Sequence, residues 1–282
     1  MPPRNAPTVR QQRLGTELRK LRERSGMTAA QAGHRLGADQ ARISNIESGR
    51  AGISADRVRL LAGTYDCVDQ DLIEALTTMA SGRRRQWWEE YRGVLPDPML
   101  DIAELEHHAV TLRTAQTSSL PGLLQTPGHA RVVFGQMVPP LPPHHVEHRA
   151  SHRVKRQAVL YDRAVPYTAI IHEAALRMRF GGTDMTRGQL DHIVATSERD
   201  NITVLVIPFE AGEFPGSGQT ILYAQGPVPQ LDTVQLDQWH GPAFLDAEGD
   251  LANYRNILDR LESLALAADE SRDLIRSIAS SL

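Results

Sequence analysis

The chain has little cysteine, little aromatic area and no long hydrophobic run. Its single cysteine among 282 residues, Cys67, excludes an internal disulfide framework and a cysteine-rich zinc site. No apolar run approaches the roughly 18–20 residues of a transmembrane helix, and the N-terminal stretch MPPRNAPTVRQQR lacks the apolar core of a secretory signal. With 41% hydrophobic and 23% charged residues, the composition is typical of a folded soluble protein, which we expect in the cytoplasm and not at a membrane.

Motifs for catalysis and cofactor binding are missing as well. The glycine-rich stretches FGGTDM and EFPGSGQT have neither the lysine of a phosphate-binding loop nor the strand-to-helix spacing of a dinucleotide fold. His144, His148 and His152 would share one face of a helix and are a possible metal site, but their strongly basic surroundings favour a solvated face. We therefore expect no catalytic residues, no cofactor and no metal.

Charge is divided unevenly along the chain. Residues 1–60 hold 12 Lys and Arg against 5 Asp and Glu, whereas residues 61–282 hold 19 against 29. A basic first part joined to an acidic body indicates that the first part meets a polyanion.

Short helices separated by turn signals fill residues 14–65. Thr28 and Gln31 have the spacing of a capping box, which predicts a helix start. Gly37 can end that helix, and Asp39 can cap the next one. The four expected helices run from Leu14 to Gly26, over AAQAGHRLG, over residues 40–48 and over ADRVRLLAGTY.

The segment LRKLRERSGMTAAQAGHRLGADQARISNIESGR resembles the repressor-type helix-turn-helix domain of phage repressors and of the xenobiotic-response-element regulators. The resemblance places Gly33 where two helices cross closely, and it points Ile43 and Ile46 inward from the third helix. It also matches Arg22 and Glu47 to a pair that ties the first helix to the end of the third. A structural bundle without DNA binding is the alternative.

The same resemblance implies a set of DNA contacts. Side chains at the start of a helix in the major groove read base edges, and the positions it makes base-facing are Gln40, Ala41, Ser44 and Asn45. Those that would meet phosphates are Thr28, Arg42 and Arg50. Ala29 departs from the family, which often has a phosphate-binding glutamine there.

Residues 66–98 are expected to form a helical linker. VDQDLIEALTTMA reads as a helix, and SGRRRQWWEEYRG follows it. The arginine run beside Trp87 and Trp88 suggests either a stacking site for nucleic acid or an anchor between domains, and we favour the anchor.

From about residue 99 onward the sequence predicts an α+β domain with a mostly antiparallel sheet, because Gly/Pro-rich turns separate the later strands. The expected strands are 110–114, 167–173, 202–208, 219–225 and 233–239, and the expected helices lie near 99–109, 144–160, 184–199, 250–267 and 269–280.

Residues from about 80 to 280 also resemble the C-terminal domain of the WhiJ-like, antitoxin-like regulators of actinobacteria. The motifs that carry the resemblance are WWEEYRG, LRTAQTSSLPGLLQTPGHAR, HEAALRMRFGG, NITVLVIPFEAG and YRNILDRLESLALAADESRDLI. Such regulators are often paired with a small protein encoded next to them.

Four parts are thus expected: a flexible basic tail over residues 1–13, an all-α helix-turn-helix domain over 14–65, a linker over 66–98 and a regulatory α+β domain over 99–282. The sequence favours a dimeric, repressor-like regulator that binds double-stranded DNA at a palindromic operator. The alternatives are an antitoxin-like protein that neutralises a small neighbouring protein, and a receptor for a small molecule.

Overall fold

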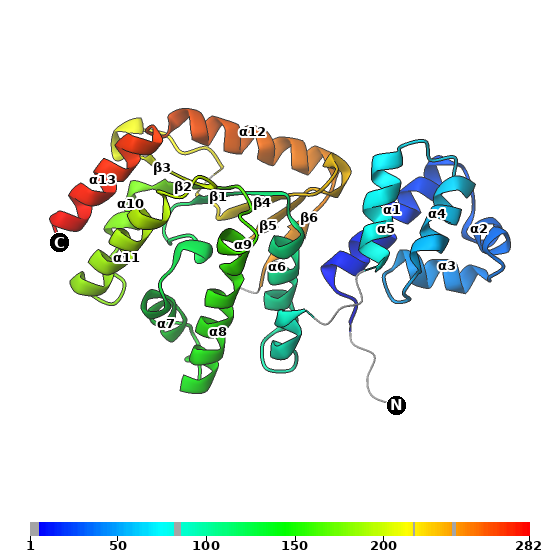
Figure 1. The fold of residues 1–282 in the computed structure, drawn as a ribbon, viewed down its shortest axis with the longest axis horizontal. Coiled ribbons are helices and arrows are strands. Elements are labelled where there is room, and N and C mark those ends of the chain that lie inside the picture. The colour runs from blue at the N-terminus through cyan, green and yellow to red at the C-terminus, as the bar shows by residue number, and fades with distance from the viewer. Residues whose placement is uncertain (1–5, 82–85, 217, 239–240) are drawn as a thin grey trace. The chain divides into compact units, whose positions relative to one another are not determined.

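The computed structural model describes residues 6–81, 86–216, 218–238 and 241–282. They form two compact units, shown as ribbons in Figure 1. The first comprises Met1–Trp87 with Pro227–Leu231, and the second comprises Trp88–Gly226 with Asp232–Leu282. Within the described ranges, no helix is both long and apolar enough to cross a membrane.

The first unit is helical. Its helices are α1 (Val9–Arg24), α2 (Ala29–Leu36), α3 (Gln40–Glu47), α4 (Ala55–Thr64) and α5 (Gln70–Ser81), and the short η4 (Pro229–Leu231) belongs to it as well. Leu18, Ile43 and Leu61 are almost fully buried in its core. The expected all-α character of this part is confirmed.

The first helix begins earlier than expected. Thr8 accepts a hydrogen bond from the backbone N–H of Gln11, whose side chain accepts one from the backbone of Thr8. This capping box starts α1 at Val9, so residues 9–13 are helical and the expected tail over 1–13 is wrong for them.

Helix α5 is part of the same core. Its Leu72, Ala75 and Leu76 are buried in one cluster with the leucines of α1 and α4. The segment expected to begin a linker therefore contributes the fifth helix of the first unit.

The second unit is an α+β fold around one six-stranded sheet. Its strands are β1 (Thr111–Gln116), β2 (Tyr167–His172), β3 (Ile202–Ile207), β4 (Ile221–Gln225), β5 (Thr233–Leu236) and β6 (Ala243–Leu245). Its helices are α6 (Asp97–His108), η2 (Gly122–Leu124), α7 (Pro127–Gly135), α8 (Pro143–Arg156), α9 (Ala158–Tyr161), α10 (Glu173–Arg177), α11 (Thr183–Thr196), η3 (Phe209–Ala211), α12 (Glu248–Leu264) and α13 (Ala268–Ser280).

The sheet is mixed, with the order β3-β2-β1-β4-β5-β6. β1 pairs with β2, and β2 with β3, in parallel. The pairs β1–β4, β4–β5 and β5–β6 are antiparallel. The expected α+β class is confirmed, and the consecutive antiparallel pairs β4–β5 and β5–β6 are joined by short connections that contain Gly and Pro. β1 is the strand at which the chain order reverses, because β2 and β3 lie on one side of it and β4 lies on the other.

Helices cover both faces of the sheet (Figure 1). α12 covers one face. Its Leu251, Leu258 and Leu261 are buried in one cluster with residues of the sheet such as Tyr223 of β4. The other face is covered by α11 and α13 and by the helices that follow β1, around a core that includes Ile171. The sheet is therefore covered on both sides, which agrees with the largely apolar sequences of β2, β3 and β4.

Candidate nucleic-acid interface

The turn between α2 and α3 is fixed by caps at both ends. Thr28 accepts from the backbone N–H of Gln31, and the Gln31 side chain accepts in return from the backbone of Thr28 at 2.8 Å. Gly37 ends α2 in the left-handed region with a φ of 66°. Asp39 then caps α3 by accepting from the backbone N–H of Arg42 at 2.7 Å. These features confirm the helix starts and the glycine stop that the sequence predicts.

Two glycines allow the helices to approach closely. A Cβ added at Gly33 would lie 2.8 Å from the carbonyl oxygen of Ala38, at the turn into α3. A Cβ at Gly15 of α1 would lie 2.4 Å from the carbonyl oxygen of Glu47, at the end of α3. The close crossing expected at Gly33 is present. The one at Gly15 was not expected, because an isolated glycine inside a helix gives no signal of what lies against it.

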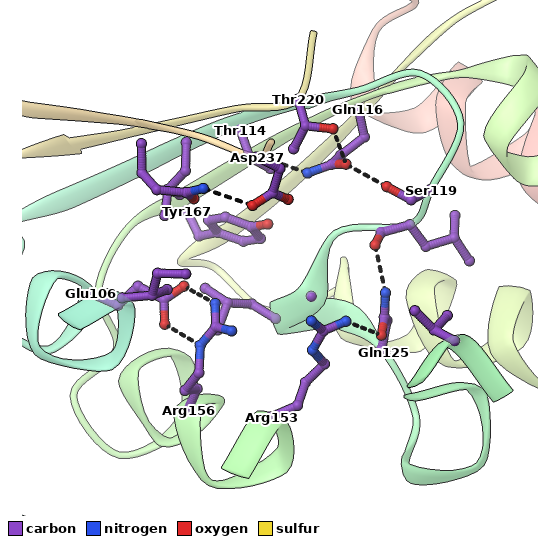
Figure 2. Close-up of a pocket in the computed structure, with 17 residues that line it drawn as sticks. Glu106, Thr114, Gln116, Ser119, Gln125, Arg153, Arg156, Tyr167, Thr220 and Asp237 are labelled. Atoms are coloured by element: carbon purple, nitrogen blue, oxygen red, sulfur yellow. Dashed lines mark hydrogen bonds and ion pairs between the residues drawn. The ribbon is translucent and has the colours of Figure 1, made fainter. Parts of the chain in front are cut away.

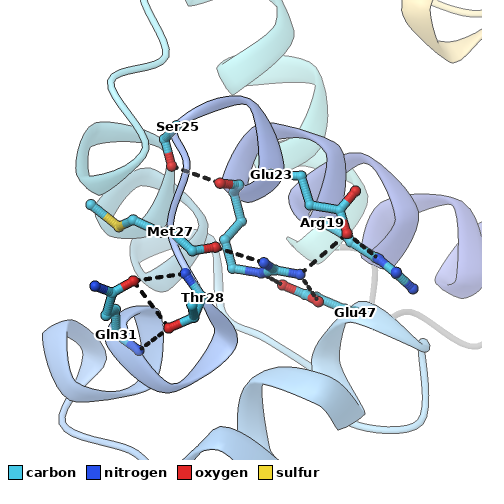
Figure 3. A network of polar contacts seen from close by, with 8 residues as sticks. Arg19, Glu23, Ser25, Met27, Thr28, Gln31 and Glu47 are labelled. Carbon is cyan, nitrogen blue, oxygen red and sulfur yellow. Dashed lines mark hydrogen bonds and ion pairs between the residues drawn. The ribbon is translucent and has the colours of Figure 1, made fainter.

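Arg22 and Glu47 form a bidentate ion pair, shown with its neighbours in Figure 3. The guanidinium also donates to the carbonyl of Met27 at 2.7 Å. The hydrogen bonds to Glu47 raise the pKa of Arg22 above its usual value. Nearby, burial and the charge of Glu47 raise the pKa of Tyr65 to about 12. The pair keeps the last residue of α3 attached to the last turn of α1.

One face of α3 is buried and the opposite face is polar. Ile43 and Ile46 are 1% and 3% exposed, whereas all four positions expected to face bases are exposed: Gln40, Ala41, Ser44 and Asn45. Since residues four apart lie on one side of a helix, these four form a continuous surface.

The residues expected at phosphates also lie on the surface. Thr28 is the exposed N-cap of α2. Arg50 is exposed and follows Gly49, whose φ of 72° ends the turn after α3. Arg42 is exposed, and its guanidinium donates to the carbonyl of Gly52 at 3.2 Å, which links α3 to the loop before α4.

Trp88 packs inside the second unit. It is 3% exposed, and its ring makes edge contacts with His107 and His108 of α6. Trp87 is half-buried and begins the 3-10 helix η1 (Trp87–Tyr91). The anchoring role expected for the two tryptophans stays a prediction, and the arginine run over 83–85 lies outside the described residues.

The three histidines of α8 that were considered as a metal site, His144, His148 and His152, do not come together. His144 and His148 are in edge contact at 6.1 Å between ring centroids, but His152 is buried against Tyr91. Burial, with the charges of Arg156 and its neighbours, lowers the pKa of His152 to about 3. Across the described part of the chain, no three potential ligand side chains form a metal site.

Comparison with known families agrees with this division. A helix-turn-helix domain model matches residues 13–76, the segment that holds α2, α3 and their supporting helices. A domain of unknown function (DUF5753) matches residues 99–277, which is more than half of the chain. No curated protein and no solved structure matches. The chain therefore belongs to the DUF5753 family and carries the helix-turn-helix domain of a DNA-binding regulator ahead of that family's domain.

Proposed function

We propose that this protein is a sequence-specific transcriptional regulator in which α3 reads the major groove of double-stranded DNA. The observation that supports this most is the exposed polar face of α3 opposite two buried isoleucines. A helix whose apolar residues are used to hold it in place has its other face available for base edges.

The residues of that face have suitable chemistry. Gln40 and Asn45 each carry an amide that can both accept and donate, which matches the N6 and N7 positions of adenine. Ser44 can bond to several bases, and the methyl of Ala41 can pack against a thymine methyl.

Backbone contacts would set the register. The N-terminus of α2 at Thr28 presents backbone N–H groups, which favour an anion such as a phosphate. Arg42 on α3 and Arg50 just after it would add positive charge for further phosphates. The excess of Lys and Arg over residues 1–60 supplies the attraction that is independent of sequence.

The protein is proposed to act as a homodimer in the cytoplasm. A single short α3 reaches only a few base pairs, so a two-fold dimer on a palindromic operator would supply the remaining specificity. The second unit is proposed to hold the dimer together or to bind a small protein encoded nearby, as its resemblance to the WhiJ-like regulators suggests. A repressor-like action is part of this proposal.

Selection from a pool of random duplexes tests the proposal. The full chain, at about physiological salt, is expected to enrich one sequence with two half-sites whose centres are about 10 base pairs or a multiple apart. Footprinting on the enriched duplex should then protect the major groove of both half-sites. A pool that remains random after repeated rounds contradicts sequence-specific binding. Enrichment of a single half-site would contradict the proposed homodimer but not sequence-specific binding.

A further inference from the structure

The second unit contains a polar cavity of about 190 Å³ between one face of the sheet and the helices α6, α8 and η2. It lies beside the C-terminal end of β1, where Gln116 and Ser119 line it, and beside the start of β4, where Thr220 and Leu222 line it. Since the chain order of the sheet reverses at β1, the cavity lies at the place where α/β sheets commonly bind ligands. Figure 2 shows the side chains around it.

Two arginines of α8 reach this cavity, and one of them is already paired. Arg156 donates from Nε to Glu106 at 2.7 Å and from Nη2 to the other oxygen of the same carboxylate at 2.5 Å. Glu106 is 2% exposed and Arg156 is 10% exposed in their side chains. This bidentate pair is buried and its charges cancel.

Arg153 has no such carboxylate. Its Nη1 donates to the neutral amide oxygen of Gln125 at 2.7 Å, and its guanidinium lies over the ring of Phe134 at 4.4 Å. Its Nε is buried, and no described residue accepts a hydrogen bond from it. Burial is the main reason that the pKa of Arg153 falls to about 10. Arg153 is half-buried as a residue, and a cation with a buried, unused N–H is costly unless an acceptor meets it.

Gly122 leaves space at that N–H. A Cβ added there would meet Arg153 first, at 3.5 Å from Nε, and its backbone does not lie in the left-handed region. The glycine is therefore not required by the turn, and its effect is to keep the guanidinium uncovered.

Neutral hydrogen-bonding groups form the opposite wall. Gln116 accepts from Ser119 at 2.8 Å and donates to Thr114 at 3.2 Å. The acidic residue on this side is the exposed Asp237, which accepts from Gln235 at 2.7 Å. Because the charge of Glu106 is neutralised by Arg156, the exposed Asp237 is the group that would repel a second negative charge on a ligand. The cavity therefore favours one charge and several hydrogen-bonding groups.

We propose that this cavity binds a small organic acid with a single carboxylate, held by Arg153, and with amide or hydroxyl groups that face Gln116. The cavity is below the roughly 300–1,000 Å³ of sites for drug-sized molecules, so the ligand is small. The site is independent of the DNA-binding proposal, since every residue that lines it belongs to the second unit.

N-acetylglycine is the probe for the test, because it combines one carboxylate with one amide. The Nε–Hε signal of Arg153 in the full chain, assigned from its absence in Arg153→Gln, is followed by NMR during titration. We expect saturable shifts with a dissociation constant on the order of 1–10 mM. N-acetylglycinamide, which lacks the charge, should bind at least about tenfold more weakly. Inorganic phosphate should also bind more weakly, and equal or tighter binding of phosphate would overturn the assignment to a single carboxylate.

Variants distinguish binding of the ligand in this cavity from a general attraction of the anion to positive charge on α8. Lys155→Gln removes the same charge from the exposed side of α8 and should leave binding intact, whereas Arg153→Gln should abolish the thermal stabilisation by N-acetylglycine. Gly122→Ala should weaken binding of N-acetylglycine because the added methyl covers Nε of Arg153. If Arg153→Gln fails to fold, this variant alone tests whether Arg153 holds the ligand. Binding that is unchanged in Gly122→Ala and Arg153→Gln, or no saturable shift up to about 50 mM, overturns the proposal.

Discussion

Arg22 Nε lies 2.5 Å from one carboxylate oxygen of Glu47, and Arg22 Nη2 lies 3.0 Å from the other. The two side chains are 10% and 8% exposed. A parallel two-bond pair of this kind fixes direction as well as distance, so it orients the end of α3 relative to α1. The position of the proposed reading face therefore depends on a contact between α1 and the C-terminal end of α3.

Breaking that pair should destabilise the first unit. Glu47→Gln removes the bidentate partner of Arg22 and leaves only its 3.6 Å contact with the half-exposed Glu23. We expect a loss of about 3 kcal/mol in the stability of α3, measured by amide hydrogen exchange in the full chain. The double variant Arg22→Met/Glu47→Met should recover part of the loss. Glu74→Gln, which breaks the exposed pair with Arg59 in the same unit, is the control and should change nothing measurable. A Glu47→Gln protein as stable as the control would contradict the role of the pair.

The close crossing at Gly33 gives a second prediction. Gly33→Ala places a methyl against backbone at 2.8 Å and should destabilise the helix pair by about 1–3 kcal/mol. Gly63→Ala on α4 is the matched control, because no atom lies within 4 Å of the added Cβ. That control should stabilise its helix by about 0.5–1 kcal/mol, the usual gain of alanine over glycine. Hydrogen exchange of α2 and α3 compares the two, and an equal effect of both variants would exclude a tight crossing.

The local signals in the sequence were sufficient for the helix-turn-helix core. Capping by Thr28 and Asp39 depends on residues three positions apart, and the spacing of Ile43 and Ile46 identifies the buried side of α3. The same type of signal was present at Thr8 and Gln11, where it extends α1 to Val9.

Contacts between distant residues could not be read in this way. Glu106 and Arg156 are 50 positions apart, so nothing in the basic stretch around Arg156 shows that it faces a buried carboxylate. His152 was expected on a solvated face for the same reason, and it is fully buried. The three-residue strand β6 and the five-residue helix α10 are too short to show a period of their own.

Salt dependence tests the proposed phosphate contacts. Arg50→Ala should lower the slope of log affinity against log salt by about one and weaken all duplexes alike. Arg276→Ala, which removes an exposed charge from α13, is the control and should leave the slope unchanged. Fluorescence anisotropy between about 50 and 200 mM salt provides the measurement. An unchanged slope in Arg50→Ala would contradict a phosphate contact by Arg50.

Acid stability should depend on His129. Burial lowers the pKa of its imidazole to about 4 from 6.5, so the unfolded chain binds this proton between those values while the folded chain does not. The contribution to stability is therefore complete above pH 6.5 and is lost as the pH falls toward 4. His129→Phe keeps an aromatic ring against Phe180 but cannot bind the proton. In urea unfolding, its free energy of unfolding should therefore fall less steeply between pH 6.5 and 4, by up to about 1.4 kcal/mol per pH unit. His144→Gln, at the exposed start of α8, is the control, and equal pH profiles for the two variants would contradict this assignment.

The most direct test of the central proposal is the affinity of Asn45→Ala for the selected duplex relative to a scrambled duplex of the same length, at one salt concentration. If α3 reads bases, the difference in binding free energy between the selected and the scrambled duplex should shrink by about 1–3 kcal/mol relative to the unmodified chain. The affinity for the scrambled duplex should stay the same. A ratio that is unchanged in both Asn45→Ala and Gln40→Ala would contradict base reading by this face of α3.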